Sequence, residues 1–124
     1  MNSKKDSLFE IINSPENLLK RMKIGELVRA TLPIILVENL ISEIEINNLL
    51  EDKYSKFTFD MNYPVLRKVN PKITILENRK INDYTRYYAG IYGNGVTQYL
   101  ISSEWYERNI VDYIKWLKRK VKEN

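Results

Sequence analysis

The sequence predicts an α+β fold of the winged helix-turn-helix type, with helices beside a small antiparallel β-hairpin sheet and a C-terminal helix. Three observations lead to this prediction. Apolar residues recur at helical spacing over residues 24–40, Ser42 begins a second helix, and Asn94-Gly95 separates two β-prone segments. The whole chain, 1–124, is expected to form one domain, with 1–23 as an N-terminal helical extension and 24–124 as the winged-helix-like core.

Two short helical segments are expected before the main helix. Ser7 and Glu10 have the spacing of a capping box, in which each side chain accepts a hydrogen bond from a free amide of the first turn. Ser14-Pro15-Glu16 then starts residues 15–22 as one or two turns. Ser14 serves as the cap, and Pro15 occupies the first helical position, where a missing N–H does no harm.

The most regular helical pattern covers residues 24–40. Its apolar stripe comprises Ile24, Leu27, Val28, Thr31, Leu32, Ile35, Leu36 and Leu40. Pro33 removes one backbone hydrogen bond, so we expect a kink or break near Thr31. Ser42-Glu43-Ile44-Glu45 has the spacing of a second capping box, which predicts a helix through about Asp52. The inward residues of that helix are expected to be Ile46, Leu49 and Leu50.

Residues 55–70 are predicted as the third helical piece of the winged-helix-like core, with Ser55 as its cap. Its expected apolar anchors are Phe57, Phe59, Val65, Leu66 and Val69. Pro64 disfavours a helical conformation at the residue before it, so the helix either stops near Met61 or restarts with Pro64 in its first turn. Beyond Pro71, the β-prone residues 73–76 predict a short strand.

Asn94-Gly95 predicts a type I′ turn between strands at residues 84–93 and 96–102, because both turn positions need positive φ. Pairing Gly93 with Val96 places Tyr92 opposite Thr97, Gly90 opposite Tyr99, and Tyr88 opposite Ile101. The opposite side is expected to face the core, and it carries Tyr87, Ala89, Ile91, Gln98 and Leu100. A slip of one residue would exchange the two sides.

The last helix is predicted from Glu104 to about Lys122, capped by Ser102 or Ser103. Trp105 and Trp116 would then lie on nearly the same face of this helix, where packing explains them better than ligand binding. The cations of residues 118–122 suit the negative end of a helix, so they are first explained as helix termination.

Composition excludes several enzyme classes. The chain has no Cys and no His, which removes thiolate nucleophiles, zinc sites built on these residues, and histidine bases. Glu51-Asp52-Lys53 resembles part of a nuclease pattern, but it lies at the expected end of a helix with no acidic strand before it. We therefore expect no catalysis, no metal and no cofactor. No apolar run approaches the roughly 18 residues of a membrane span, and the N-terminus lacks an apolar leader, so a cytoplasmic location is expected.

Positive charge is concentrated in the second half of the chain. Residues 1–62 hold 8 basic and 10 acidic side chains, whereas residues 63–124 hold 12 basic and 6 acidic ones. Tyrosines are interleaved with these cations, a combination that suits phosphates and stacked bases. The alternative explanation is a solvated surface.

In a winged helix, the third helix enters the major groove and the wing contacts the backbone. The predicted nucleic-acid contacts are Lys56, Arg67 and Lys68 on or near the third helix, and Arg79, Lys80 and Arg86 on the wing side. The candidates for base stacking or partner contact are Tyr88, Tyr92 and Tyr99. A proline in the third helix would weaken base readout more than phosphate binding.

Four runs carry a resemblance to known proteins: residues 24–28, 63–68, Tyr87-Tyr88, and 103–108. Together they resemble a small module at the C-terminal end of bacterial restriction and other mobile-element nuclease proteins. The similarity covers about residues 24–118 and implies an accessory or DNA-engaging role. In those families catalysis resides in other domains, and no functional residue carries over.

Three functions remain open from the sequence. One is a module that binds duplex DNA largely through phosphates and recruits or regulates a partner. Another is a protein-interaction module, including a homodimerisation domain, that binds no nucleic acid. The third is a mobile-element inhibitor that occupies the DNA channel of a host enzyme.

Overall fold

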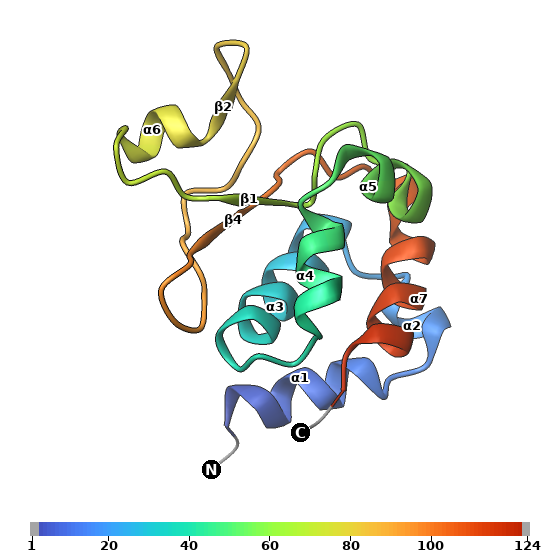
Figure 1. The fold of residues 1–124 in the computed structure, drawn as a ribbon. Coiled ribbons are helices and arrows are strands. Elements are labelled where there is room, and N and C mark those ends of the chain that lie inside the picture. The colour runs from blue at the N-terminus through green and yellow to red at the C-terminus, as the bar shows by residue number, and fades with distance from the viewer. Residues whose placement is uncertain (1–2, 123–124) are drawn as a thin grey trace.

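Helices and two small antiparallel sheets form the α+β fold of this chain in a computed structural model that describes residues 3–122 (Figure 1). In chain order the elements are α1 (Lys4–Ile12), α2 (Glu16–Leu19), α3 (Ile24–Val37), α4 (Glu43–Leu49), α5 (Asp52–Phe59), β1 (Leu66–Lys68), α6 (Ile75–Asn78), β2 (Lys80–Ile81), β3 (Tyr84–Thr85), β4 (Tyr99–Ile101), the 3-10 turn η1 (Glu107–Asn109) and α7 (Ile110–Lys120). The α+β class is as predicted from the sequence.

The first helix begins earlier than predicted. Ser3, not Ser7, is its cap, and the reciprocal bonds of the capping box are made with Asp6. The second start is also displaced by one residue, because Pro15 is the cap of α2 and precedes its first helical residue. α1 packs against α3 and α7, and the Lys118 ammonium donates to the carbonyl of Ile12 at 2.6 Å. The N-terminal helices thus complete the core.

α3 carries the predicted apolar stripe as far as Leu36 and ends at Val37, so Leu40 follows the helix; every member of the stripe is buried. The helix runs through Pro33 without the break predicted near Thr31. The Thr31 hydroxyl lies 2.7 Å from both the Leu27 carbonyl and the buried hydroxyl of Tyr113. Because α3 is covered on several sides, tertiary packing can hold it continuous despite the missing proline N–H.

The corner between α3 and α4 forms as expected, and the Ser42 hydroxyl accepts the amide of Glu45 at 3.1 Å. α4 ends at Leu49 rather than near Asp52. The third helical piece, α5, covers Asp52–Phe59: it begins three residues before Ser55 and ends close to Met61, one of the two ends that were predicted. Ser55 lies inside α5, where its hydroxyl accepts the amide of Val65 at 3.0 Å instead of capping the helix.

Beyond α5 the chain extends instead of continuing as a helix. Asp60 has a left-handed φ of 60°, which ends α5, and β1 then pairs with β4 in the register Leu66 to Ile101 and Lys68 to Tyr99. Phe57, predicted as an anchor, is 92% exposed. The strand predicted at residues 73–76 is also wrong, because Thr74 caps the short helix α6 there.

The predicted hairpin is correct at its base and wrong at its tip. The backbone amide of Tyr88 donates to the carbonyl of Ile101 at 2.9 Å, in agreement with the predicted pairing. Tyr92, however, pairs with Tyr99 rather than with Thr97. Gly95 has a positive φ of 121°, whereas Asn94 does not, so the type I′ turn is absent. The side-chain amide of Asn94 instead donates to the carbonyl of Val37 at 2.6 Å, which ties the loop to α3.

The side of the hairpin predicted to face the core is only partly buried. Tyr87 and Leu100 are buried as expected, whereas Ala89, Ile91 and Gln98 are exposed. Between the bridge of Tyr87 with Ser102 and that of Tyr92 with Tyr99, one segment advances five residues and the other three, so the regular pairing of the predicted hairpin is interrupted there.

The C-terminal helix is shorter than predicted. η1 precedes α7, and Trp105 lies before both, with its indole N–H donating to the carbonyl of Ser102 at 2.8 Å. Trp105, Tyr113 and Trp116 nevertheless surround the ring of Phe59, with centroid distances of 5.6, 6.1 and 5.8 Å. This aromatic cluster joins α5 to α7.

Within residues 3–122, no helix combines the length and the apolar character needed to cross a membrane.

The buried hydroxyl pair of Thr31 and Tyr113 provides a test of the packing between α3 and α7. We expect Thr31→Val to lower the free energy of unfolding by about 1–3 kcal/mol, because the Tyr113 hydroxyl loses its partner inside the core. The measurement is urea unfolding of the two single variants and of Thr31→Val/Tyr113→Phe. The double variant should lose less stability than the two single losses added together, and strict additivity would show that the hydroxyls are not coupled.

Candidate functional site

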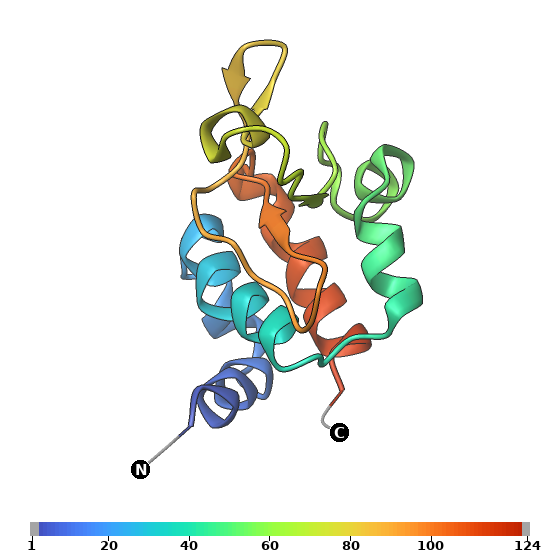
Figure 2. The ribbon, with the colours of Figure 1, turned by 60° about the vertical axis from the view of Figure 1, so that its left-hand side comes forward.

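One segment of the chain projects from the main helical body. Residues 69–86, here called the projecting segment, contain α6, β2 and β3 and extend beyond the body of the protein in both ribbon views (Figures 1 and 2). Its aliphatic side chains Ile73, Ile75 and Leu76 are exposed, and so is Tyr84. The sequence predicted a strand here, which would have required a partner; the structure has a short helix with its apolar residues in solvent.

Hydrogen bonds at its base give the projecting segment a defined shape. The side chain of Asn78 is buried, and it accepts the amide of Asn70 at 2.7 Å while donating to the carbonyls of Asn70 and Thr74 at 3.0 and 2.9 Å. Arg67 reaches from β1 and donates to the carbonyls of Lys80 and Asn78 at 2.6 and 3.1 Å. The exposed apolar side chains are therefore held on an ordered backbone.

Two more of the predicted phosphate contacts also form internal bonds. Arg79 donates through Nε to the carbonyl of Tyr87 at 2.9 Å. Arg86 forms an ion pair with Glu104 at 2.6 Å, and its guanidinium lies over the ring of Tyr63 with its centre 5.0 Å from the ring centroid. The hydrogen bond to Glu104 raises the pKa of Arg86 above its usual value. Like Arg67, these arginines stabilise the base of the projecting segment.

The structure brings Lys56, Arg67 and Lys68 to one region of the surface. Lys56 lines a hollow of about 510 Å³ beside α5, and Arg67 and Lys68 line an adjacent hollow of about 550 Å³. Asp52 and Asn62 line both hollows, so the two are contiguous. Arg67 and Lys68 lie on the strand β1, however, and not on a third helix as predicted.

The predicted stacking residues pack against the protein. Tyr88, Tyr92 and Tyr99 are each partly buried and contact the core. The hydroxyl of Tyr88 lies close to Gly25, where a Cβ atom would come within 3.2 Å of it, and the Arg29 guanidinium lies over the Tyr88 ring at 5.2 Å. These contacts place Tyr88 against α3, and none of the three tyrosines forms an open platform for bases.

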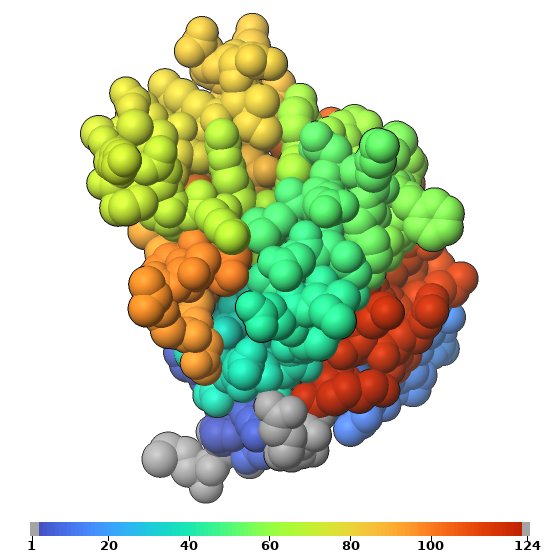
Figure 3. Space-filling model, in the orientation of Figure 1, coloured from blue at the N-terminus to red at the C-terminus, as the bar shows by residue number. Residues whose placement is uncertain are grey.

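A large hollow lies between α4, the loop of residues 93–98, and the C-terminal end of α7. Figure 3 shows these three elements on one face of the molecule. We call this hollow the α4–α7 groove; its volume is about 890 Å³. Three cations line it: Arg119, Lys120 and Lys122. The sequence indicated these residues only as favourable charges at a helix end, and nothing in their spacing showed which elements would lie opposite them.

A buried carboxylate joins the helices below this groove. Glu45 is 4% exposed, and its Oε2 accepts the Tyr54 hydroxyl at 2.5 Å and the Trp116 indole N–H at 2.8 Å. Burial, followed by the bond to Glu45, raises the pKa of Tyr54 to about 12. Lys120 lies 3.9 Å from the other carboxylate oxygen. Glu45 thereby links α4 to α5 and α7; the sequence had placed only its aliphatic neighbours inward.

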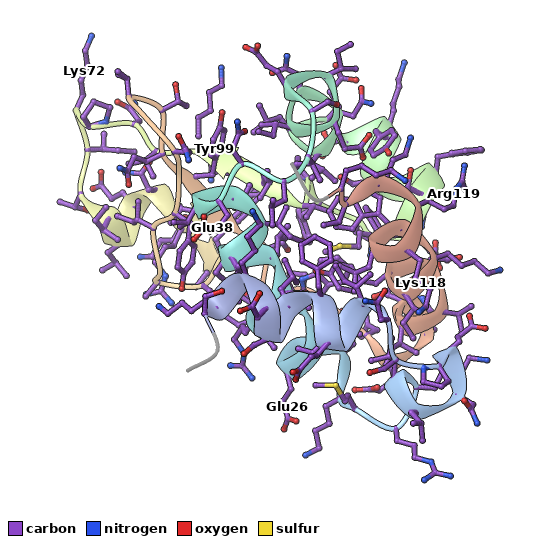
Figure 4. The ribbon with its side chains drawn as sticks, turned by 90° about the horizontal axis from the view of Figure 1, so that it is seen from below. Glu26, Glu38, Lys72, Tyr99, Lys118 and Arg119 are labelled. Atoms are coloured by element: carbon purple, nitrogen blue, oxygen red, sulfur yellow. The ribbon has the colours of Figure 1, made fainter. Side chains whose placement is uncertain are left out.

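The two basic regions of the second half of the chain do not form one surface. Lys72, on the projecting segment, and Arg119, on α7, lie at opposite sides of the view from below (Figure 4). The cations counted together in the sequence therefore belong to separate parts of the fold.

Comparison with protein-family models, with curated proteins and with solved structures finds no match to this chain.

The tyrosine environments predict that stability falls at alkaline pH. Burial raises the pKa of Tyr54 and of Tyr87 to about 12, above the value of about 10 in an unfolded chain. Between these values the unfolded state releases protons that the folded state retains, so the free energy of unfolding should decrease as pH rises above about 10. Urea unfolding across this range measures the slope.

Absorbance titration of the tyrosines provides the matching readout. Tyr54 and Tyr87 should ionise later than exposed tyrosines, and Tyr54→Phe should make the loss of stability with pH less steep. Ionisation of all 9 tyrosines near pH 10, in a chain that keeps its native circular dichroism, would show that burial does not raise the pKa of Tyr54 and Tyr87.

Proposed function

We propose that this protein is a protein-interaction module that contacts its partner through the projecting segment. The observation that supports this most strongly is the ordered display of exposed aliphatic side chains on α6 and just before it. The most exposed of them, Leu76, has 55% of its surface in solvent. Clustered apolar side chains on a protein surface are typical of interaction sites, whereas single ones are common everywhere. A preformed backbone also lowers the entropy lost on binding.

The state of the arginines also favours this function over phosphate binding. Arg67, Arg79 and Arg86 bond to backbone carbonyls or to Glu104, so a phosphate would compete with contacts that hold the segment. Replacing such bonds costs free energy that a new phosphate contact must first recover. The same arginines instead stabilise the surface on which Ile73, Ile75 and Leu76 are presented.

A second candidate is binding of duplex DNA, and one observation favours it. Lys56 and Lys68 line contiguous hollows between α5 and β1, where cations from two elements could contact neighbouring phosphates. Lys56 already pairs with Asp60 at 2.8 Å, but both side chains are about half exposed, so that pair contributes little and can exchange for a phosphate.

The proposed function predicts that Ile73→Ser/Leu76→Ser abolishes binding to a partner without unfolding the chain. Both side chains are exposed, so their loss removes little folding energy but removes apolar area from the contact. The measurement is quantitative mass spectrometry of proteins retained by the immobilised chain from an extract of its source cells. A partner retained in stoichiometric amount by the wild-type chain should be lost with this variant.

A matched control is Leu18→Ser/Val37→Ser, which removes two exposed apolar side chains elsewhere and should retain the partner. The extract is used with and without nuclease, and Lys56→Gln/Lys68→Gln is included. Equal retention by Ile73→Ser/Leu76→Ser and the wild type would contradict the proposed function. Retention that disappears with nuclease and with Lys56→Gln/Lys68→Gln would establish the nucleic-acid candidate instead.

A further inference from the structure

The α4–α7 groove has walls that are tied to one another. Asn94 anchors the 93–98 loop to the end of α3 through the Val37 carbonyl at 2.6 Å. The amide of Lys122 donates to the carbonyl of Leu40 at 3.0 Å, which holds the chain after α7 against the corner before α4. With Glu45 bonded to Trp116 below, the three walls keep their spacing in the absence of a ligand.

The loop wall itself has a tight shape. A Cβ atom on Gly93 would come within 2.5 Å of the Thr97 carbonyl oxygen, a distance that the backbone cannot accept. The backbone between Tyr92 and Tyr99, which exchange hydrogen bonds of 3.0 and 2.8 Å, therefore closes on itself closely. This leaves the side chain of Val96 fully exposed beside the groove.

Apolar side chains line the groove from two sides. Ile44, which is 74% exposed, and Ile46 come from α4. Val96 and the partly buried Tyr99 come from the loop and from β4. The exposed aliphatic pair Ile44 and Val96 would lose contact with water if a chain segment lay between the walls, which is a favourable contribution to binding.

The charge of the lining is mainly positive. Arg119, Lys120 and Lys122 provide three cations, whereas the acidic lining residues are Glu43 and Glu45. Glu45 is buried and already accepts bonds from three neighbours, so it offers little to a ligand. Within residues 3–122, Arg119 and Lys122 form no ion pair.

We propose that the α4–α7 groove binds an acidic segment of a partner protein that also carries apolar side chains. The carboxylates of the segment would contact Arg119, Lys120 and Lys122, and its apolar side chains would cover Ile44 and Val96. Charge complementarity decides the sign of the ligand. This site goes beyond the proposed function, which concerns the projecting segment on a different part of the fold.

A protein segment fits the lining better than a nucleic acid does. Single-stranded nucleic acids gain affinity from bases stacked on open aromatic rings. The lining contains one aromatic residue, Tyr99, and it is partly buried. Its exposed apolar residues are aliphatic, which suits aliphatic and aromatic side chains of a peptide.

The experiment selects short peptides from a random phage-displayed library on the full chain and measures the selected peptides by fluorescence anisotropy. The selected sequences should combine Asp or Glu with apolar residues. Arg119→Glu/Lys122→Glu should weaken their binding by about tenfold or more, because it places like charges together. Ile44→Ser/Val96→Ser should weaken it as well. Both pairs of residues are solvent-exposed, so the variants should keep the native circular dichroism.

The matched control is Lys20→Glu/Arg21→Glu, which makes the same change of charge on exposed residues at the end of α2 and should leave binding unchanged. Peptides without acidic residues, an empty selection, or equal affinity for Arg119→Glu/Lys122→Glu would overturn the proposal. Peptides that bind this variant normally but not Ile73→Ser/Leu76→Ser would support the proposed function while overturning the groove. Labelled duplex DNA that binds the wild type but not Arg119→Glu/Lys122→Glu would make the groove a nucleic-acid site.

Discussion

The contacts of one aromatic ring hold the fold together. Phe59, the last residue of α5, packs edge-on against Trp105 and Trp116 and lies 6.1 Å from the ring of Tyr113. Its carbonyl accepts the Asn109 side-chain amide at 2.7 Å, just where η1 leads into α7. The end of one helix and the start of another are thus fixed at a single point in the core, and aromatic pairs of this geometry add to the energy of burial itself.

The α4–α7 groove and the projecting segment both depend on that arrangement. With α5 and α7 fixed, Trp116 can bond to Glu45, and this bond positions α4 as a wall of the α4–α7 groove. β1 leaves the end of α5 and pairs with β4, and Arg67 on β1 then reaches the base of the projecting segment. Polar side chains that seemed available for ligands are largely used to join elements.

Local patterns predicted the elements whose stability is local. The stripe on α3 and the cap at Ser42 are properties of neighbouring residues, and both are present. β1 was missed because its partner, β4, lies far along the chain and the residues in between carry turn signals. Likewise, the tether from Asn94 to Val37 replaces the turn that Asn-Gly favours in isolation, and no local rule contains that contact.

The site residues were harder to predict for a similar reason. A basic side chain in a sequence does not reveal whether it bonds to groups inside the protein. Arg67, Arg79 and Arg86 each form such bonds, although the Nε of Arg86 is buried without a hydrogen-bond partner among the described residues. Nor did the spacing indicate that Glu45 would be buried while Phe57 would be exposed. For Glu45 and Arg86 the deciding contacts come from residues remote in the sequence, Trp116 and Glu104.

Amide hydrogen exchange of the free chain measures whether the projecting segment is ordered before it meets any partner. The amides of Asn78, Arg79 and Arg86 donate to carbonyls within the segment, so they should exchange much more slowly than in an unstructured peptide. Asn78→Ala should remove that protection there while leaving α3 and α7 protected. If these three amides of the wild-type chain exchange as fast as those of an unstructured peptide, the projecting segment is not ordered in the free chain.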